Sequence, residues 1–205
     1  MTRIILVRHG QTEWNRVERF RGRADIPLNE TGLAQAEATG RRIAAERKLS
    51  AVYSSPLSRT IKTAGVIARY FDLPVLAHIG LIDIDYGQWQ GLTPDEVREN
   101  WPQMIDAWYT KPDSLHIPGG ETLSDVRTRA MKAVKELVDH HEGETIVIVG
   151  HTVINRIILL GVLGLSNDRF WRLRQDTCAI NSFEAEGGDF TLVSINDTCH
   201  LHSGI

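Results

Sequence analysis

Short apolar runs alternate along the chain with longer stretches of helical period. Two of the runs, Ile4–Val7 and Thr145–Val149, are continuous and rich in β-branched residues, which is typical of central strands in a parallel sheet. The other predicted strands are Ala51–Tyr53, Pro74–Ala77 and the two arms of a hairpin near a sheet edge, Asn181–Glu184 and Phe190–Ile195. The predicted helices are Thr31–Arg47, with Thr31 as its cap, Leu57–Tyr70 and Thr122–His140.

This alternation predicts an α/β fold, a layered sheet of mostly parallel strands with helices on both faces. One region departs from it, because Leu92–Asp113 has two helical starts, at Pro94 and Pro102, and no strand. We expect a small helical cap insertion at about residues 92–118. It would lie over the end of the sheet where ligands bind in such folds.

Chain length and composition narrow the class of protein. At about 150 residues per domain, the 205 residues are expected to form a single domain spanning 1–205. Hydrophobic residues make up 42% and charged residues 24%, as in ordinary soluble proteins. A formal net charge of −3 gives no electrostatic support for nucleic-acid binding. These values favour an enzyme that acts on small molecules.

The cysteine spacing and the lengths of the apolar segments indicate the cellular compartment in which the protein is expected. Cys178 and Cys199 stand apart with no CxxC spacing, so neither a zinc ribbon nor a disulfide framework is predicted. The first apolar run ends at Arg8 and is too short for a signal-peptide core, and no stretch approaches the ~20 apolar residues of a membrane span. We expect a cytoplasmic protein without membrane association; a homodimer is left open.

Two histidines follow the two predicted central strands. His9 comes directly after Arg8 at the end of the first strand, and His151 follows Gly150 at the end of the second. If these strands are parallel and adjacent, both imidazoles face the same crevice. A buried structural role is the ordinary alternative for a single histidine, but two in the same context favour a shared site.

Arginine indicates what this crevice holds. Arg8 precedes the first histidine, and Arg59 stands at the start of a helix just after a strand. Guanidinium groups match phosphate oxygens bidentately, and a helix N-terminus adds N–H donors. Alone, Arg59 would be interpreted as an exposed helical residue. Together with Arg8 and the histidines it favours a phosphoryl pocket.

Five sequence blocks carry these residues in a defined order. They are Arg8–Asn15 (RHGQTEWN), Gly22–Gly32 (GRADIPLNETG), Ser54–Thr60 (SSPLSRT), Asp83–Gly91 (DIDYGQWQG) and Val149–His151 (VGH). In residues, order and spacing the chain resembles the histidine phosphatase superfamily, also called phosphoglycerate mutase-like. The resemblance extends from Ile4 to about Arg156.

The resemblance implies a role for each matching residue. His9 would be the nucleophile that becomes phosphohistidine, while Arg8, Arg59 and a neutral or protonated His151 would hold the phosphoryl oxygens without a metal or other cofactor. Asn15 would add a side-chain contact. The substrate-binding set implied in this way is Arg8, Asn15, Arg21, Gly22, Arg59, His151 and Thr152.

Asp83 stands where the family has its proton donor, usually a glutamate. Asp85, two residues on, would share a face with Asp83 in an extended segment, either as a substitute donor or as a neighbour whose charge raises the pKa of Asp83. Glu13 is a weaker alternative, because a solvent-facing position beside Trp14 explains it as well.

The insertion bears on the choice between phosphatase and mutase. Mutases of the family carry more arginines there, to hold phosphoglycerate and the bisphosphate, whereas residues 84–118 offer only Arg98, Lys111 and His116. The chain is therefore expected to be a metal-independent phosphatase of small phosphomonoesters, of the phosphoserine, α-ribazole phosphate or broad-specificity type. A 2,3-bisphosphoglycerate-dependent phosphoglycerate mutase is the alternative. A metal-dependent hydrolase is more distant, because no HExxH motif accompanies the eight histidines.

The remaining candidates flank these blocks. Trp101, Trp108 and Tyr109 suit the enclosure of a partly apolar or uncharged alcohol, although a core position is the ordinary interpretation of a tryptophan. Arg16, Arg19 and Arg23 belong with Arg21 to a basic cluster, of which we expect only Arg21 to reach the substrate and the rest to form a solvated face.

Overall fold

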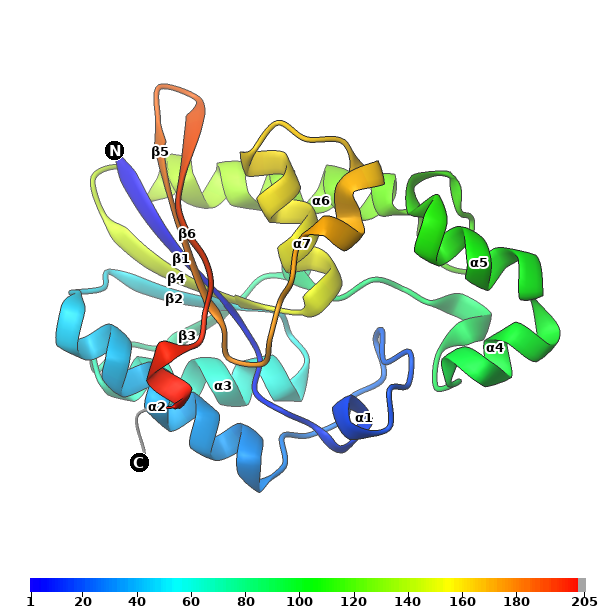
Figure 1. Cartoon of the computed structure of the whole chain (residues 1–205). Coiled ribbons are helices and arrows are strands. Elements are labelled where there is room, and N and C mark those ends of the chain that lie inside the picture. Colours follow the sequence, from blue (N-terminus) through cyan, green and yellow to red (C-terminus); the bar gives the residue numbers. More distant parts are fainter. Residues whose placement is uncertain (203–205) are drawn as a thin grey trace.

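A computed structural model describes residues 1–202 and contains a six-stranded sheet in the order β3-β2-β4-β1-β5-β6 (Figure 1). The strands are β1 (Thr2–Arg8), β2 (Ala51–Ser54), β3 (Val75–Ala77), β4 (Thr145–Gly150), β5 (Ile180–Glu186) and β6 (Asp189–Asp197). The first four are mutually parallel, while β5 and β6 form an antiparallel hairpin on the far side of β1. The expected mostly parallel sheet with an edge hairpin is confirmed.

Helices cover both faces of the sheet, as predicted. Helices α2 (Glu30–Glu46) and α3 (Ser58–Arg69) lie on one face, and α6 (Leu123–His140) and α7 (Thr152–Val162) on the other (Figure 1). Successive residues of β1 therefore enter different cores, Ile5 on the side of α2 and α3, and Ile4 on the side of α6 and α7. This explains why the strand is apolar throughout rather than alternating.

Two helix predictions need correction. Helix α2 begins at Glu30, because the Asn29 side chain accepts a hydrogen bond from the Gly32 amide and so caps the helix in place of Thr31. No helix is predicted after His151, yet α7 is present. Eight of its 11 residues are buried, so it has little of the polar stripe that makes a helix recognisable. Helix α6 does begin after Thr122, which forms a capping box.

The expected helical insertion is present and contains no strand. Helices α4 (Pro94–Asn100) and α5 (Pro102–Thr110) form the insertion and extend beyond one end of the sheet (Figure 1). The short helix α1 (Glu13–Arg16) comes earlier in the chain, soon after β1. Val97, Ile105 and Trp108 of the insertion belong to the main hydrophobic core. The insertion therefore shares the main hydrophobic core and is held by packing as well as by its chain connections. Within residues 1–202, no helix has the length and apolar character to cross a bilayer.

Candidate active site

The backbone pairing of β1 and β4 brings the two histidines together. The strands are parallel neighbours in a register that aligns Arg8 with Gly150, and the His9 amide donates to the Gly150 carbonyl at 3.0 Å. One residue beyond this ladder, the rings of His9 and His151 lie edge to face with centroids 5.2 Å apart. The predicted adjacency of the two strands is confirmed, and it places both imidazoles in one buried cluster.

A backbone carbonyl determines the tautomer of His9. Its Nδ1 lies 2.6 Å from the Gly10 oxygen, which can only accept, so Nδ1 carries the proton and Nε2 has a lone pair. Burial lowers the pKa of His9 well below its usual range, and the neighbouring Arg59 and Arg8 lower it further. His9 is therefore neutral at pH 7, with a nucleophilic Nε2.

Backbone carbonyls also hold Arg59. Its two terminal nitrogens donate to Ala24 and Gly22, each at 2.7 Å, and its Nε donates to Nδ1 of His151 at 3.2 Å. Gly22 adopts φ +50°, and a Cβ there would come within 2.9 Å of the Ile84 carbonyl, so glycine is required at this turn.

The sequence leaves open whether His151 is neutral or protonated, and its contacts in the structure answer this. Because Nδ1 accepts from Arg59, the proton lies on Nε2, which donates to the Ser55 hydroxyl at 2.8 Å. Burial, followed by Arg59, lowers the pKa of His151 well below its usual range. The ring is neutral, and the positive charge of the cluster comes from arginine alone.

Arg8 is supported from the hairpin side of the sheet. It donates to the Gln175 carbonyl at 2.6 Å, and the Gln175 amide group is bonded in turn to Asn181, whose Nδ2 donates to the Leu6 carbonyl. Burial lowers the pKa of Arg8 to about 9, with smaller contributions from nearby arginines. The Nε of Arg8 is buried without a hydrogen-bond partner. Arg8 is thus charged at neutral pH, and its buried Nε–H is available to a ligand.

Asp83, and not Asp85, joins this cluster. Its Oδ2 lies 3.6 Å from Arg59 Nη2 and 3.8 Å from His151 Nδ1. Burial raises the pKa of Asp83, partly offset by Arg59. Asp85 instead accepts from the Gly87 amide and pairs with Arg23 at 3.3 Å, so the shared face and the charge effect expected for Asp85 are both wrong.

A cavity of about 460 Å³ opens beside the buried cluster. Its lining includes five residues of the predicted set: Arg8, Asn15, Arg21, Asp83 and Thr152. The other predicted residues do not line the cavity. They lie in the buried cluster behind Asp83 and Arg8, which do line it: His9, Gly22, Arg59 and His151.

The remaining polar candidates differ in their contacts. The Thr152 hydroxyl is buried without a partner, and Asn15 uses its Oδ1 to accept from Thr12. Glu13 pairs with Arg16 in solvent, outside the cavity.

Of the basic cluster, Arg16 is exposed and pairs with Glu13, as expected of a solvated face, whereas Arg19 and Arg23 are placed differently. Arg19 lines the cavity rim and donates to the Gly91 carbonyl at 2.6 Å. Arg23 pairs with Asp85 and Glu121. These side chains connect the segment after α1 to residues 83–91, to the insertion and to Glu121. Arg21 does reach the cavity, where it donates to the Trp14 carbonyl at 3.0 Å.

Aromatic side chains form one wall of the cavity, and the sequence predicted only part of this wall. Trp101 packs against the main core and does not line the cavity, contrary to expectation. Trp108 and Tyr109 of the insertion contact Trp171 at centroid distances of 5.6 and 5.1 Å, and Trp108 contacts Phe170 at 5.3 Å. The side chain of Trp171 donates to the Trp108 carbonyl at 2.6 Å. Trp108 is at once a buried core residue and a wall residue.

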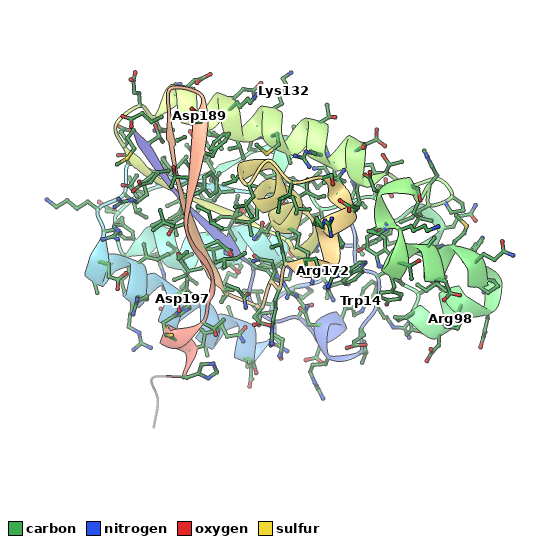
Figure 2. The ribbon with its side chains drawn as sticks, turned by 45° about the horizontal axis from the view of Figure 1, so that its top comes forward. Trp14, Arg98, Lys132, Arg172, Asp189 and Asp197 are labelled. Carbon is green, nitrogen blue, oxygen red and sulfur yellow. The ribbon has the colours of Figure 1, made fainter. Side chains whose placement is uncertain are left out.

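Arg156 was missed altogether, although it lines the same cavity. The available signal was its position, because it is the one charged residue among residues 152–167. Arg98, one of the few cations of residues 84–118, does not line the cavity; it sits on the outer side of the insertion (Figure 2), paired with Asp106 at 2.7 Å. In residues 1–202, no group of three or more His, Cys, Asp or Glu side chains is placed to hold a metal ion.

Comparison with known proteins agrees with this geometry. The family model of the histidine phosphatase superfamily (branch 1) matches residues 4–198, and the chain belongs to this superfamily. It is an enzyme that hydrolyses small-molecule phosphomonoesters.

Three similar proteins illustrate the relationship. The chain is 35% identical over 201 residues to phosphoserine phosphatase 1 of Hydrogenobacter thermophilus, covering 98% of this chain and 95% of that protein. It is 36% identical over 205 residues to the metal-independent phosphoserine phosphatase of Arabidopsis thaliana, covering 99% and 84%. The solved structure of YhfR from Bacillus stearothermophilus superimposes with a TM-score of 0.94 at 32% identity, covering 98% of this chain and all of that chain.

Proposed function

We propose that the protein hydrolyses its substrate through a phosphohistidine on His9. The observation that carries the proposal is the bond from His9 Nδ1 to the Gly10 carbonyl, because it leaves Nε2 unprotonated beside two arginines. Arg8 and Arg59 bind the phosphoryl oxygens together with neutral His151. Asn15, Gly22, Arg21 and Thr152 complete the binding set.

In the first step the Nε2 lone pair forms a bond to phosphorus. The ester P–O bond breaks, its electron pair leaves with the alcohol oxygen, and that oxygen takes the proton of Asp83. The entering phosphoryl dianion adds negative charge near Asp83, which raises the pKa of Asp83 further and favours the protonated donor.

In the second step water attacks the phosphorus of phospho-His9. The water proton passes to the Asp83 carboxylate, the P–N bond breaks and its electron pair returns to Nε2. Protonated Asp83 is thereby regenerated for the next cycle. The arginine side chains supply the charge stabilisation that a metal ion gives in other phosphatases, so the reaction is metal-independent.

The substrate is a small phosphomonoester, and the names of the two relatives favour phosphoserine over α-ribazole phosphate. We place the enzyme in the cytoplasm, as a single domain whose helical cap encloses the substrate alcohol. A homodimer is an open alternative to the monomer, to be decided by sedimentation.

A phosphoglycerate mutase remains the second candidate. The observation in its favour is that Arg19, Arg21 and Arg156 line the cavity from outside the insertion, so the chain has more cations there than residues 84–118 alone supply. Interconversion of 3- and 2-phosphoglycerate, dependent on 2,3-bisphosphoglycerate and faster than phosphate release, would replace the phosphatase by the mutase.

The test is the phosphoenzyme itself. Rapid quenching during turnover of p-nitrophenyl phosphate, followed by mass spectrometry, is expected to find an acid-labile, base-stable phosphoryl group on the peptide that contains His9. His9→Ala should lose both the label and turnover. His78→Ala is the matched control, because His78 pairs with Glu136 near the protein surface and should retain both. A label on any other residue would overturn the assignment.

A further inference from the structure

Arg156 is a cation without an anionic partner. It projects from α7 into the cavity, and its guanidinium carbon lies 5.0 Å from the ring centre of Phe170 and 4.8 Å from that of Trp171. Its Nε is buried without a hydrogen-bond partner, and no hydrogen bond or ion pair joins it to any residue in the part of the chain that the structure describes.

The other cavity arginines differ from Arg156 in this respect. Arg8 donates to the Gln175 carbonyl, Arg21 to that of Trp14, and Arg19 to that of Gly91 and to the Glu96 carboxylate. A half-buried guanidinium without such acceptors is unfavourable, since it has lost water without gaining hydrogen bonds. Its preference for an incoming anion is correspondingly strong.

The aromatic rings give the guanidinium group a definite orientation. Stacking on ring faces uses the flat sides of the group and leaves its N–H edge available, and a fork of N–H donors matches a carboxylate bidentately. Arg156 Nε is buried beside these rings, and a hydrogen bond in such low-dielectric surroundings is stronger than in water.

We propose that Arg156 binds a carboxylate on the alcohol portion of the substrate, so that the enzyme selects phosphomonoesters of small hydroxy acids. The inference rests on the proposed function, which assigns the phosphoryl group to the Arg8 end of the same cavity. Arg8 and Arg156 line the same cavity of about 460 Å³, so one compact acid ester can present its phosphoryl group to Arg8 and its carboxylate to Arg156. An uncharged alcohol, the expectation from Trp108 and Tyr109 alone, would leave Arg156 unpaired.

The test compares two ligands that differ only at this position. 3-Phosphoglycerate carries a carboxylate where glycerol 3-phosphate carries a hydroxymethyl group, and each is measured as a competitive inhibitor of p-nitrophenyl phosphate hydrolysis. In the wild type, 3-phosphoglycerate should bind roughly 10- to 150-fold more tightly, the range for a hydrogen bond to a charged group. Arg156→Met should remove this difference while leaving inhibition by glycerol 3-phosphate unchanged, and Arg156→Lys should restore part of it.

Arg172→Met is the matched control, because Arg172 is exposed, follows Trp171 directly and does not line the cavity. It removes the same charge and should leave both inhibition constants unchanged. Equal affinity of the wild type for the two ligands, or equal weakening of both by Arg156→Met, would overturn the proposal.

Two further outcomes separate the inference from its alternatives. If 2,3-bisphosphoglycerate binds more tightly than 3-phosphoglycerate and the gain disappears in Arg156→Met, the group bound is a second phosphate rather than a carboxylate, and the proposal is overturned. If the wild type does not hydrolyse p-nitrophenyl phosphate, the proposed function fails instead. Calorimetric titration with the same matched pair of ligands then decides the carboxylate subsite by itself.

Discussion

The two ends of the cavity are built in different ways. At the phosphoryl end, Arg8 ends β1, His9 follows it and Arg59 lies in the first turn of α3, and backbone carbonyls hold each of them. At the alcohol end, the wall consists of side chains from α5, α7 and residues 167–172 that contact each other through their rings. The phosphoryl chemistry thus depends on the backbone, whereas selectivity depends on the packing of distant segments.

The two ends of the cavity also differ in how they respond to substitution. A carbonyl acceptor persists when its own side chain changes, so the orientation of Arg59 tolerates substitution at Ala24. An aromatic wall has no such protection, because its geometry is the packing of its side chains. Changes at the phosphoryl end should therefore alter rate, and changes at the wall should alter stability and choice of substrate.

The largest effect is expected for Asp83→Asn on alkyl phosphates. An alkoxide is a poor leaving group without a proton, so the rate should fall by about 10²–10⁴-fold, the usual contribution of general acid catalysis. With p-nitrophenyl phosphate the leaving group is stable as an anion, and phosphorylation of His9 should change little. Stopped-flow rates with both substrates measure the difference. Equal losses would mean that Asp83 positions the substrate rather than protonating it.

Removing the wall tests the other end. Trp108 is buried and contacts Phe170 and Trp171, so Trp108→Ala should lower the free energy of unfolding by about 3–5 kcal/mol. For a chain of this size the melting temperature should fall by roughly 6–20 °C.

Tyr109→Ala provides the comparison for this variant, since Tyr109 is 44% exposed and its removal should have a much smaller effect. Differential scanning calorimetry measures both. Similar small shifts in the two variants would show that the wall is not a packed unit.

The pH dependence should distinguish the same residues in the wild type. Because the pKa of Asp83 is raised, its protonated form persists above the usual carboxyl range, and the rate with an alkyl phosphate should fall as the pH rises through that pKa. This alkaline limb should be absent with p-nitrophenyl phosphate. The lowered pKa values of His9 and His151 put the acidic limb below pH 6.5, the ordinary value for histidine. An acidic limb above that value would contradict the buried, neutral histidines.

The smallest expected effect is that of chelation. Since Arg8 and Arg59 supply the positive charge, dialysis against EDTA should leave the rate unchanged with either substrate. Loss of activity that zinc or manganese restores would favour the metal-dependent hydrolase instead.

The features that could be predicted are those formed by residues close together in the sequence. Arg8 and His9 are consecutive, and the apolar strand before them identifies their place at a sheet end. Asp85 was misjudged because its segment is not a strand: the Asp85 carboxylate accepts from the Gly87 amide, where a 3-10 turn begins, so the two-residue period does not apply. The surroundings of Arg156 depend on Phe170 and Trp171, which are brought to it only by the folded chain.

The pairing of β1 with β4 also affects how this protein can diversify. The relative position of His9 and His151 follows from a ladder of backbone hydrogen bonds, so inserting one residue in either strand would displace one imidazole from the other. The insertion and residues 167–172 are not part of that ladder. They can be lengthened, shortened or exchanged while the histidine pair stays in register, so new specificities can be grafted onto an unaltered reaction centre.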